Sequence, residues 1–69
     1  MTMAQQLSDT LSLREEQCVR YLLEGMSNKQ IAWQLQLSTR TIEFYLDNVK
    51  SKLSCKNKTQ LIVKLARFL

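Results

Sequence analysis

The chain of 69 residues contains no proline and no histidine, and it has only one glycine and two cysteines. The missing histidine removes the commonest general base and the commonest metal ligand of proteins. Cys18 and Cys55 lie far apart, with no partner pair at zinc spacing, which excludes a zinc finger. A chain this short makes one domain with a small core and little room for a catalytic cleft. We therefore expect no enzyme, no metal site and no cofactor.

Long apolar runs are missing as well. No segment approaches the roughly 20 apolar residues that span a bilayer. Residues 1–10, which we expect to form a flexible segment, have neither the charged nor the apolar section of a signal peptide. These observations predict a cytoplasmic protein without a membrane partner, in which both thiols stay reduced.

The apolar residues that are present recur at three- and four-residue steps and do not alternate. This spacing, with a single glycine and no proline to interrupt it, predicts an all-α fold. Ser12, Ser27, Ser38 and Asn57 are suited to cap four successive helices, and Gly25 suits the left-handed position after the first. The expected helices cover residues 13–24, 28–36, 39–53 and 58–68.

The helix expected over residues 39–53 has two chemically different sides. The side predicted to face the core carries Ile42, Leu46, Val49 and Leu53. The outward side carries Arg40, Glu43, Phe44, Asp47 and Ser51. A bulky aromatic residue such as Phe44 on the outward side is a base contact, a contact with another protein, or an accident without function.

Three residues elsewhere have a structural interpretation. Glu15 falls in the apolar sector of the first helix, and a capping box with Ser12 explains it without a functional role. Cys18 is expected to be a small core residue. Trp33 points away from the core; it either covers the stem of a neighbouring lysine or docks on a partner domain, and the sequence leaves both open.

Charge is distributed unevenly along the chain, which has a net charge of +4. Residues 1–47 carry six acidic and four basic residues, whereas residues 48–69 carry six basic residues and no acidic one. Such a basic segment suits a polyanion, because lysine and arginine near phosphates release condensed counterions. It equally suits a solvated face that keeps the domain in solution.

A short helix, a tight break and a longer helix follow one another over residues 27–46, which is typical of a helix-turn-helix. Double-stranded DNA is therefore the first partner to consider. In the last expected helix, residues 58–68, apolar residues occupy nearly half the circumference. One small core cannot bury all of them, so this helix is expected to form a dimer contact.

Three segments, together spanning residues 11–62, resemble the LuxR-type helix-turn-helix DNA-binding domain: LSLREEQCV, EGMSNKQIAWQLQLSTRTIEFYLDNVKSKL and KNKTQLI. The resemblance implies that residues 11–69 form a bacterial transcription-regulation domain of four helices, whose third helix enters the major groove and whose last helix forms a homodimer. It also implies no cofactor, and it leaves RNA polymerase and an N-terminal regulatory domain as further partners. The family often has glycine at the position of Ser54, so we expect the loop here to keep its path less easily.

The resemblance also assigns site residues. Base readout falls to Arg40, Glu43, Phe44 and Asp47. Position near a helix N-terminus, or in the cluster of lysines, independently predicts contact with the DNA backbone for Ser27, Asn28, Lys29, Ser38, Thr39, Thr41, Lys50, Lys52, Lys56 and Lys58, although capping is the first role of Ser27 and Ser38. The dimer interface falls to Cys55, Leu61, Ile62, Leu65 and Ala66.

Two alternatives stay open at this point. A promoter-reading domain of a sigma factor shares the opening of the motif and its helix spacing, but the continuation KLSCKNKTQLI argues against it. A helical protein-interaction module that has lost DNA affinity is the other alternative. The acidic residues Glu43 and Asp47 and the outward Trp33 and Phe44 favour it.

Overall fold

The structure, a computed structural model, describes residues 10–68. Four helices fill this part of the chain: α2 (Leu13–Leu23), α3 (Asn28–Leu35), α4 (Thr39–Lys52) and α5 (Lys58–Phe68). No strand occurs among the described residues, so the predicted all-α fold is confirmed, and every predicted helix end lies within one residue of the observed one. The flexible segment predicted over residues 1–10 lies outside the described residues except for its last position.

Each helix begins at a side chain that caps it, as predicted. The cap oxygens of Ser12, Ser27 and Ser38 accept hydrogen bonds from backbone N–H groups three residues on, at 3.1–3.2 Å. The side chains of Glu15 and Gln30 in turn accept hydrogen bonds from the backbone N–H groups of Ser12 and Ser27 at 2.8 Å, which completes two capping boxes. Asn57 caps α5 through the amide of Gln60 at 2.8 Å. The Gln60 side chain accepts from the amide of Lys56, one residue before the cap.

Three of the helices end in the same backbone motif. In each, the first or second residue after the helix has positive φ: Gly25 at 90°, Gln36 at 56° and Ser54 at 57°. The next amide then donates to a carbonyl five residues back, in the pairs Met26 to Tyr21, Leu37 to Ala32 and Cys55 to Lys50. These are Schellman motifs, in which the left-handed residue is most often glycine. The only glycine of the chain serves α2, so α3 and α4 end on side chains that disfavour this conformation.

Ser54→Gly is therefore expected to raise the free energy of unfolding by about 0.5–1 kcal/mol, or a few degrees in Tm, because glycine adopts the left-handed conformation without a Cβ clash. Thermal unfolding followed by circular dichroism measures the change. Ser51→Gly is the matched control, since Ser51 is exposed in the last turn of α4 and should lose about 1 kcal/mol. A Ser54→Gly variant that unfolds at a lower temperature than the wild type would contradict the interpretation.

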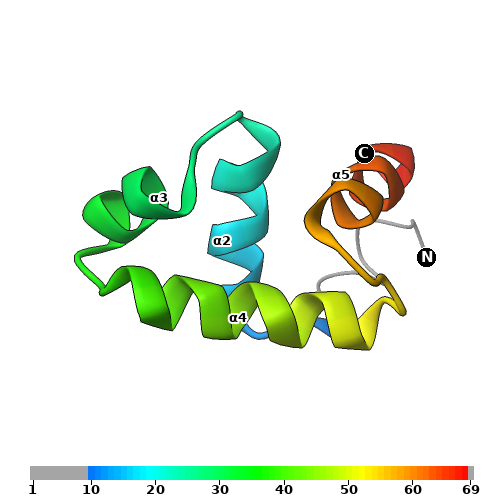
Figure 1. The fold of residues 1–69 in the computed structure, drawn as a ribbon, viewed down its shortest axis with the longest axis horizontal. Coiled ribbons are helices and arrows are strands. Elements are labelled where there is room, and N and C mark those ends of the chain that lie inside the picture. Colours follow the sequence, from blue (N-terminus) through cyan, green and yellow to red (C-terminus); the bar gives the residue numbers. More distant parts are fainter. Residues whose placement is uncertain (1–9, 69) are drawn as a thin grey trace.

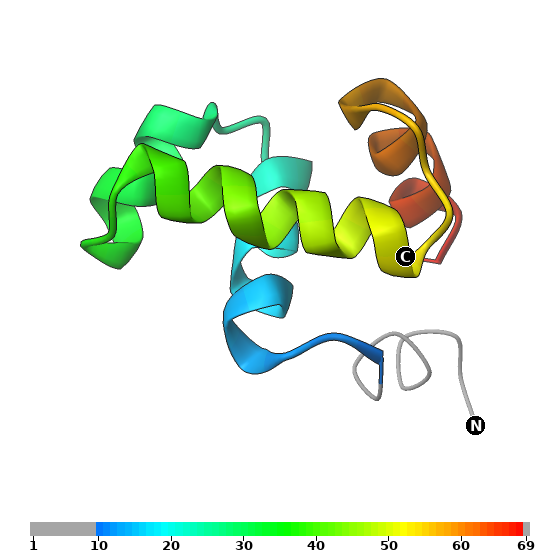
Figure 2. The same cartoon turned by 60° about the horizontal axis from the view of Figure 1, so that its bottom comes forward.

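The long helix α4 organises the domain (Figure 1). It packs against α2 and α3, and α2 also contacts α3 and α5. The residues predicted as the core side of α4, namely Ile42, Leu46, Val49 and Leu53, are all buried. Cys18 is fully buried, as expected for a core residue. Figure 2 shows α4 in front of the other helices, with one of its sides left uncovered.

Burial on α5 removes two residues from the predicted dimer interface. Leu61 and Leu65 are completely buried within the monomer, so neither can contact a second copy. Apolar spacing showed that one side of α5 is apolar, but it could not show which edge of that side faces the core. Ile62 and Val63 remain 37% and 50% exposed, so the core does leave apolar surface uncovered on this helix.

Candidate nucleic-acid interface

The four residues predicted to read bases all lie on the surface of α4. Arg40, Glu43, Phe44 and Asp47 are exposed, and the buried residues of α4 lie on its other side. Phe44 is 61% exposed, and its ring contacts that of Tyr45 edge to face, with the ring centroids 5.9 Å apart. The contact with Tyr45 supports the Phe44 ring on one edge while leaving much of it free for a ligand.

A hollow lies beside the middle of α4, and we call it the α4 hollow. It is lined by Asn28 of α3, by Lys58 and Leu61 of α5, and by Glu43, Leu46, Asp47 and Lys50 of α4. The fold therefore brings the N-terminal ends of α3 and α5 to the side of α4. Five of the residues predicted to contact DNA meet here, whereas Leu46 was predicted as core and Leu61 as part of the dimer interface.

The basic residues of the α4 hollow have different partners. Lys58 Nζ donates to the side-chain oxygen of Asn28 at 3.3 Å, which ties α5 to α3. Lys50 Nζ forms an ion pair with Asp47 Oδ1 at 2.9 Å. Among residues 10–68, Glu43 forms no ion pair. The three-residue spacing of Asp47 and Lys50 on a helix could have identified their pair from sequence.

The predicted backbone contacts at the starts of α3 and α4 are mostly exposed. Ser27 and Ser38 use their hydroxyl oxygens as caps, which confirms their first role. The hydroxyl of Thr41 is hydrogen-bonded to that of Ser38 at 2.8 Å. Lys29, Thr39 and Lys56 are exposed. Helix N-termini carry partial positive charge, so these ends of α3 and α4 favour anionic ligands.

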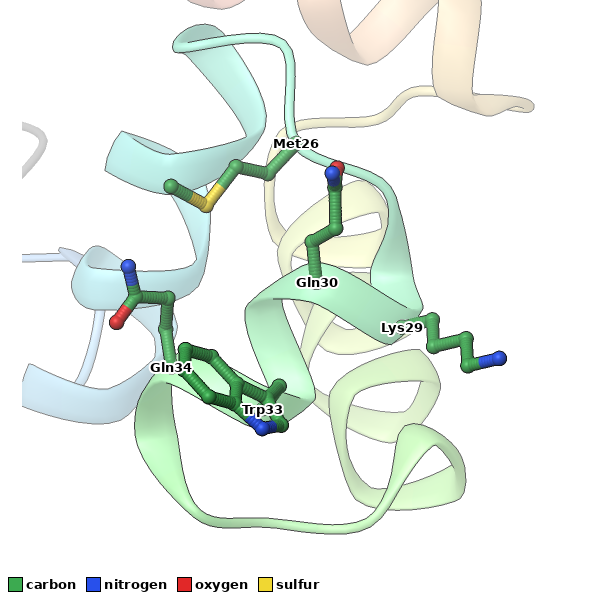
Figure 3. A pocket seen from close by; sticks show the side chains of 5 residues that line it. All are labelled: Met26, Lys29, Gln30, Trp33 and Gln34. Carbon is green, nitrogen blue, oxygen red and sulfur yellow. The ribbon is translucent and has the colours of Figure 1, made fainter.

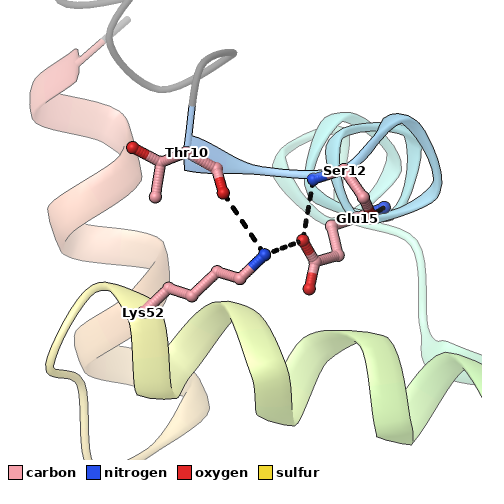
Figure 4. A network of polar contacts seen from close by, with 4 residues as sticks. All are labelled: Thr10, Ser12, Glu15 and Lys52. Carbon is pink, nitrogen blue, oxygen red and sulfur yellow. Dashed lines mark hydrogen bonds and ion pairs between the residues drawn. The ribbon is translucent and has the colours of Figure 1, made fainter.

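Lys52 is a correction to the predicted set of phosphate contacts (Figure 4). Its ammonium donates to Glu15 Oε1 at 2.5 Å and to the backbone carbonyl of Thr10 at 3.2 Å. Glu15 is only 3% exposed, so this lysine compensates a buried charge. Lys52 therefore holds α4 to α2, a role that sequence reasoning missed because the two partners are 37 residues apart.

The Lys52 contact determines the ionisation of Glu15. Burial alone would raise the pKa of this carboxyl group, but hydrogen bonds from the Lys52 ammonium and the Ser12 amide outweigh burial and hold the pKa below its ordinary value. The stabilisation from charged Glu15 is thus present above the carboxyl's unfolded pKa and is lost as pH falls through the folded pKa. Burial also raises the pKa of the Cys18 thiol, which keeps this core cysteine protonated.

Trp33 belongs to a different surface from the α4 hollow. It is 79% exposed on α3, and with Met26, Lys29, Gln30 and Gln34 it lines a second hollow (Figure 3). In Figure 3 the Lys29 side chain extends away from the indole ring. The indole thus lies outside the core, as predicted, and it does not cover the side chain of Lys29.

Two remaining predictions concern metals and membranes. Within residues 10–68, no group of three or more histidine, cysteine or acidic side chains could hold a metal ion. No helix in the described part of the chain is long and apolar enough to cross a bilayer.

Cys55, which was assigned to the dimer interface, is half-buried between α4 and α5.

Comparison with known proteins adds relatives to this geometry. The sequence pattern described as "Bacterial regulatory proteins, luxR family" matches residues 9–65. The Fimbriae Z protein of Salmonella typhimurium is 50% identical over 52 residues, which are 75% of this chain and 25% of that protein. The DNA-binding transcriptional activator EvgA of Escherichia coli is 36% identical over 61 residues, 88% of this chain and 30% of that protein.

The transcriptional regulatory protein FixJ of Bradyrhizobium diazoefficiens is 42% identical over 53 residues, 77% of this chain and 26% of that protein. This chain therefore spans about a quarter to three tenths of these relatives. The family pattern covers α2, α3 and α4 and most of α5, so it includes the segment that argues against a sigma factor. The luxR family consists of transcription regulators and not of enzymes. The chain belongs to this family of bacterial regulatory proteins, as a helix-turn-helix domain.

Proposed function

We propose that this domain binds specific sites in duplex DNA as a dimer and thereby regulates transcription. The observation that carries the proposal is the α4 hollow, where the N-terminal ends of α3 and α5 lie beside the uncovered side of α4. An α-helix fits the major groove, and flanking helix N-termini and lysines suit the phosphates on either side. The similarity to a DNA-binding transcriptional activator and to a transcriptional regulatory protein supports this function.

Each exposed residue of α4 has a chemical role in this proposal. Arg40 would donate two hydrogen bonds to a guanine edge, and a carboxylate such as Glu43 or Asp47 would accept one from the exocyclic amine of cytosine. Phe44 would contact the methyl group of a thymine. These contacts would read sequence, because the groups that they recognise differ among the base pairs of the major groove.

Phosphate contacts would supply most of the affinity. We assign them to Lys29, Lys56, Lys58, Asn28 and Thr39. Lys50 would join them only when Asp47 no longer holds its ammonium. Ser27, Ser38 and Thr41 would place the N-terminal N–H groups of α3 and α4 near phosphates. Each neutralised phosphate makes the negative slope of log K against log salt steeper by about 0.9, so the loss of a phosphate contact reduces the size of this slope by the same amount. Lys52 is left out of this set because Glu15 and Thr10 already engage its ammonium.

The dimer contact in this proposal uses the exposed residues of α5. Ile62 and Val63 give apolar surface, and Ala66 is exposed one turn further along. Half-buried Cys55 and exposed Val63 lie along one groove at the start of this helix. A regulatory domain joined to this one would supply the input signal, and RNA polymerase would be the target of the bound dimer.

Selection of duplexes from a random pool, at about 50 and 200 mM salt, tests this function directly. A motif of two repeated half-sites would support a dimeric reader and give the half-site spacing. A single half-site would contradict the dimer, and retention without a motif would contradict sequence readout. If no duplex is retained at either salt, DNA binding is wrong and the protein-interaction alternative replaces it.

Phe44→Ala is expected to lower affinity for the selected duplex about fourfold, because roughly one buried methyl group is worth about 0.8 kcal/mol. Binding to a scrambled duplex should stay the same. Fluorescence anisotropy with both duplexes measures the two affinities. Phe44→Leu is the matched control, since leucine keeps the apolar contact and should retain most of the discrimination. Equal losses on both duplexes would contradict a base contact by Phe44.

A further inference from the structure

The outward side of α4 is unusual in carrying two acids where the ligand is expected to be a polyanion. Glu43 and Asp47 both line the α4 hollow, together with Lys50 and Lys58. Only Asp47 is engaged there by a lysine, through the 2.9 Å contact with Lys50 Nζ. Asp47 has a side chain that is 69% exposed, whereas that of Lys50 is 26% exposed. On the outward side of α4, the Asp47 carboxylate is therefore more accessible to a ligand than the Lys50 side chain is.

The two lysines of the α4 hollow differ in what holds them. Lys58 is bonded to a neutral amide oxygen of Asn28, so its full positive charge is available to a phosphate. Lys50 is bonded to a carboxylate, so a phosphate must compete with Asp47 for it. If Lys50 left Asp47 for a phosphate, the unpaired carboxylate would also lie near the DNA and repel it. These two costs oppose a phosphate contact by Lys50 on an arbitrary sequence.

A cytosine at the right position changes this balance. Its exocyclic amine is a hydrogen-bond donor in the major groove, and it can take the place of the Lys50 ammonium at Asp47. The carboxylate is then still satisfied, and Lys50 is free to move to a phosphate. Asp47 is the open side of this pair, and ion pairs at a protein surface are worth only about 0.2–1 kcal/mol, so an exchange of donors at Asp47 meets little resistance.

We propose that Asp47 and Lys50 act as one unit, in which Asp47 holds Lys50 until a base donor replaces it, so that Lys50 contacts a phosphate only at the correct sequence. Lys50 then contributes to specificity although it touches no base. Lys58 serves as the unconditional phosphate contact beside it. This inference rests on the proposed DNA-binding function and adds a specificity-determining pair to it.

Salt dependence of binding distinguishes the two lysines. Anisotropy titrations between about 50 and 200 mM salt would use the selected duplex and a scrambled one. Lys50→Gln should reduce the salt slope by about 0.9 on the selected duplex and leave the slope on the scrambled duplex unchanged. Lys58→Gln, the matched control, should reduce both slopes by about 0.9. Thermal unfolding confirms that each variant is folded.

Removing the carboxylate provides the second arm. Asp47→Asn should release Lys50 on every sequence, which tightens binding to the scrambled duplex about three- to tenfold and steepens its salt slope by about 0.9. Adding Lys50→Gln to Asp47→Asn should then reduce both slopes equally. The conditional effect of Lys50 would thus disappear together with the carboxylate.

Several outcomes would overturn the exchange. If Lys50→Gln lowers the two slopes equally in the wild-type background, Lys50 contacts phosphate unconditionally. If it changes neither slope, Lys50 does not contact phosphate at all. Both results leave DNA binding intact and reject only the coupled pair. Failure of the wild type and of Asp47→Asn to bind any duplex would reject the proposed function itself, and the exchange with it.

Discussion

Lys52→Met is expected to lower the free energy of unfolding by about 2–3 kcal/mol, which is a large share of the stability of a domain this small. The methionine keeps the stem of the side chain but leaves the carboxylate of Glu15, 3% exposed, without its cation. Removing one partner of a buried pair usually costs about 3–5 kcal/mol. We expect less because the Lys52 side chain is 39% exposed and water reaches part of the pair. Thermal or urea unfolding measures the loss.

Two comparisons separate this effect from a general loss of positive charge. Lys56→Met removes an exposed lysine and should change stability by less than about 0.5 kcal/mol. Glu15→Gln combined with Lys52→Met should recover much of the loss, since the buried charge is gone. The deficit of Lys52→Met should also shrink as pH falls, because acid protonates the unpaired Glu15 in the variant and weakens the ion pair in the wild type. A deficit that stays constant from neutral to acid pH would reject the assignment.

Arg40→Ala is expected to reduce affinity for the selected duplex about 5- to 150-fold, since a bidentate arginine contact with guanine is worth about 1–3 kcal/mol. On a scrambled duplex the loss should be small and limited to one charge. Arg40 lies in the first turn of α4 and is exposed, so the change should leave the fold intact. Anisotropy titrations with both duplexes at fixed salt give the two ratios.

Arg20→Ala is the matched control for that experiment. Arg20 is exposed on α2 and pairs only with its helical neighbour Glu16, at 3.3 Å, among the described residues. It has the same charge as Arg40 but lies off α4, so its removal should weaken both duplexes alike and only slightly. If Arg20→Ala and Arg40→Ala behave the same, the contribution of Arg40 is electrostatic and not a base contact.

Local features of the fold could be predicted from the sequence because they depend on residues a few positions apart. Capping residues and apolar spacing located all four described helices, and the exposed side of α4 followed from the same periodicity. The glycine that the family often has at the position of Ser54 led us to expect that the loop keeps its path less easily, and Ser54 does have the positive φ that glycine would adopt without a clash. At each of these positions, the residues that determine the local structure lie in the same short segment as that structure.

Features that join distant segments could not be predicted in this way. The pairing of Lys52 with Glu15 depends on how α4 crosses α2, and nothing local to either residue indicates it. The same holds for the direction in which Leu61 and Leu65 face. The α4 hollow also needed the fold, because its lining comes from three helices.

The bond between Lys52 and the carbonyl of Thr10 links the beginning of the described chain to the last turn of α4. Thr10 precedes α2, yet one side chain connects its backbone directly to the end of the helix that carries Arg40 and Phe44. The same ammonium also binds Glu15 of α2, so the stretch just before α2 and the last turn of α4 are held together at one point. The segment that precedes α2 therefore lies beside the C-terminal end of the helix whose exposed side carries Arg40 and Phe44.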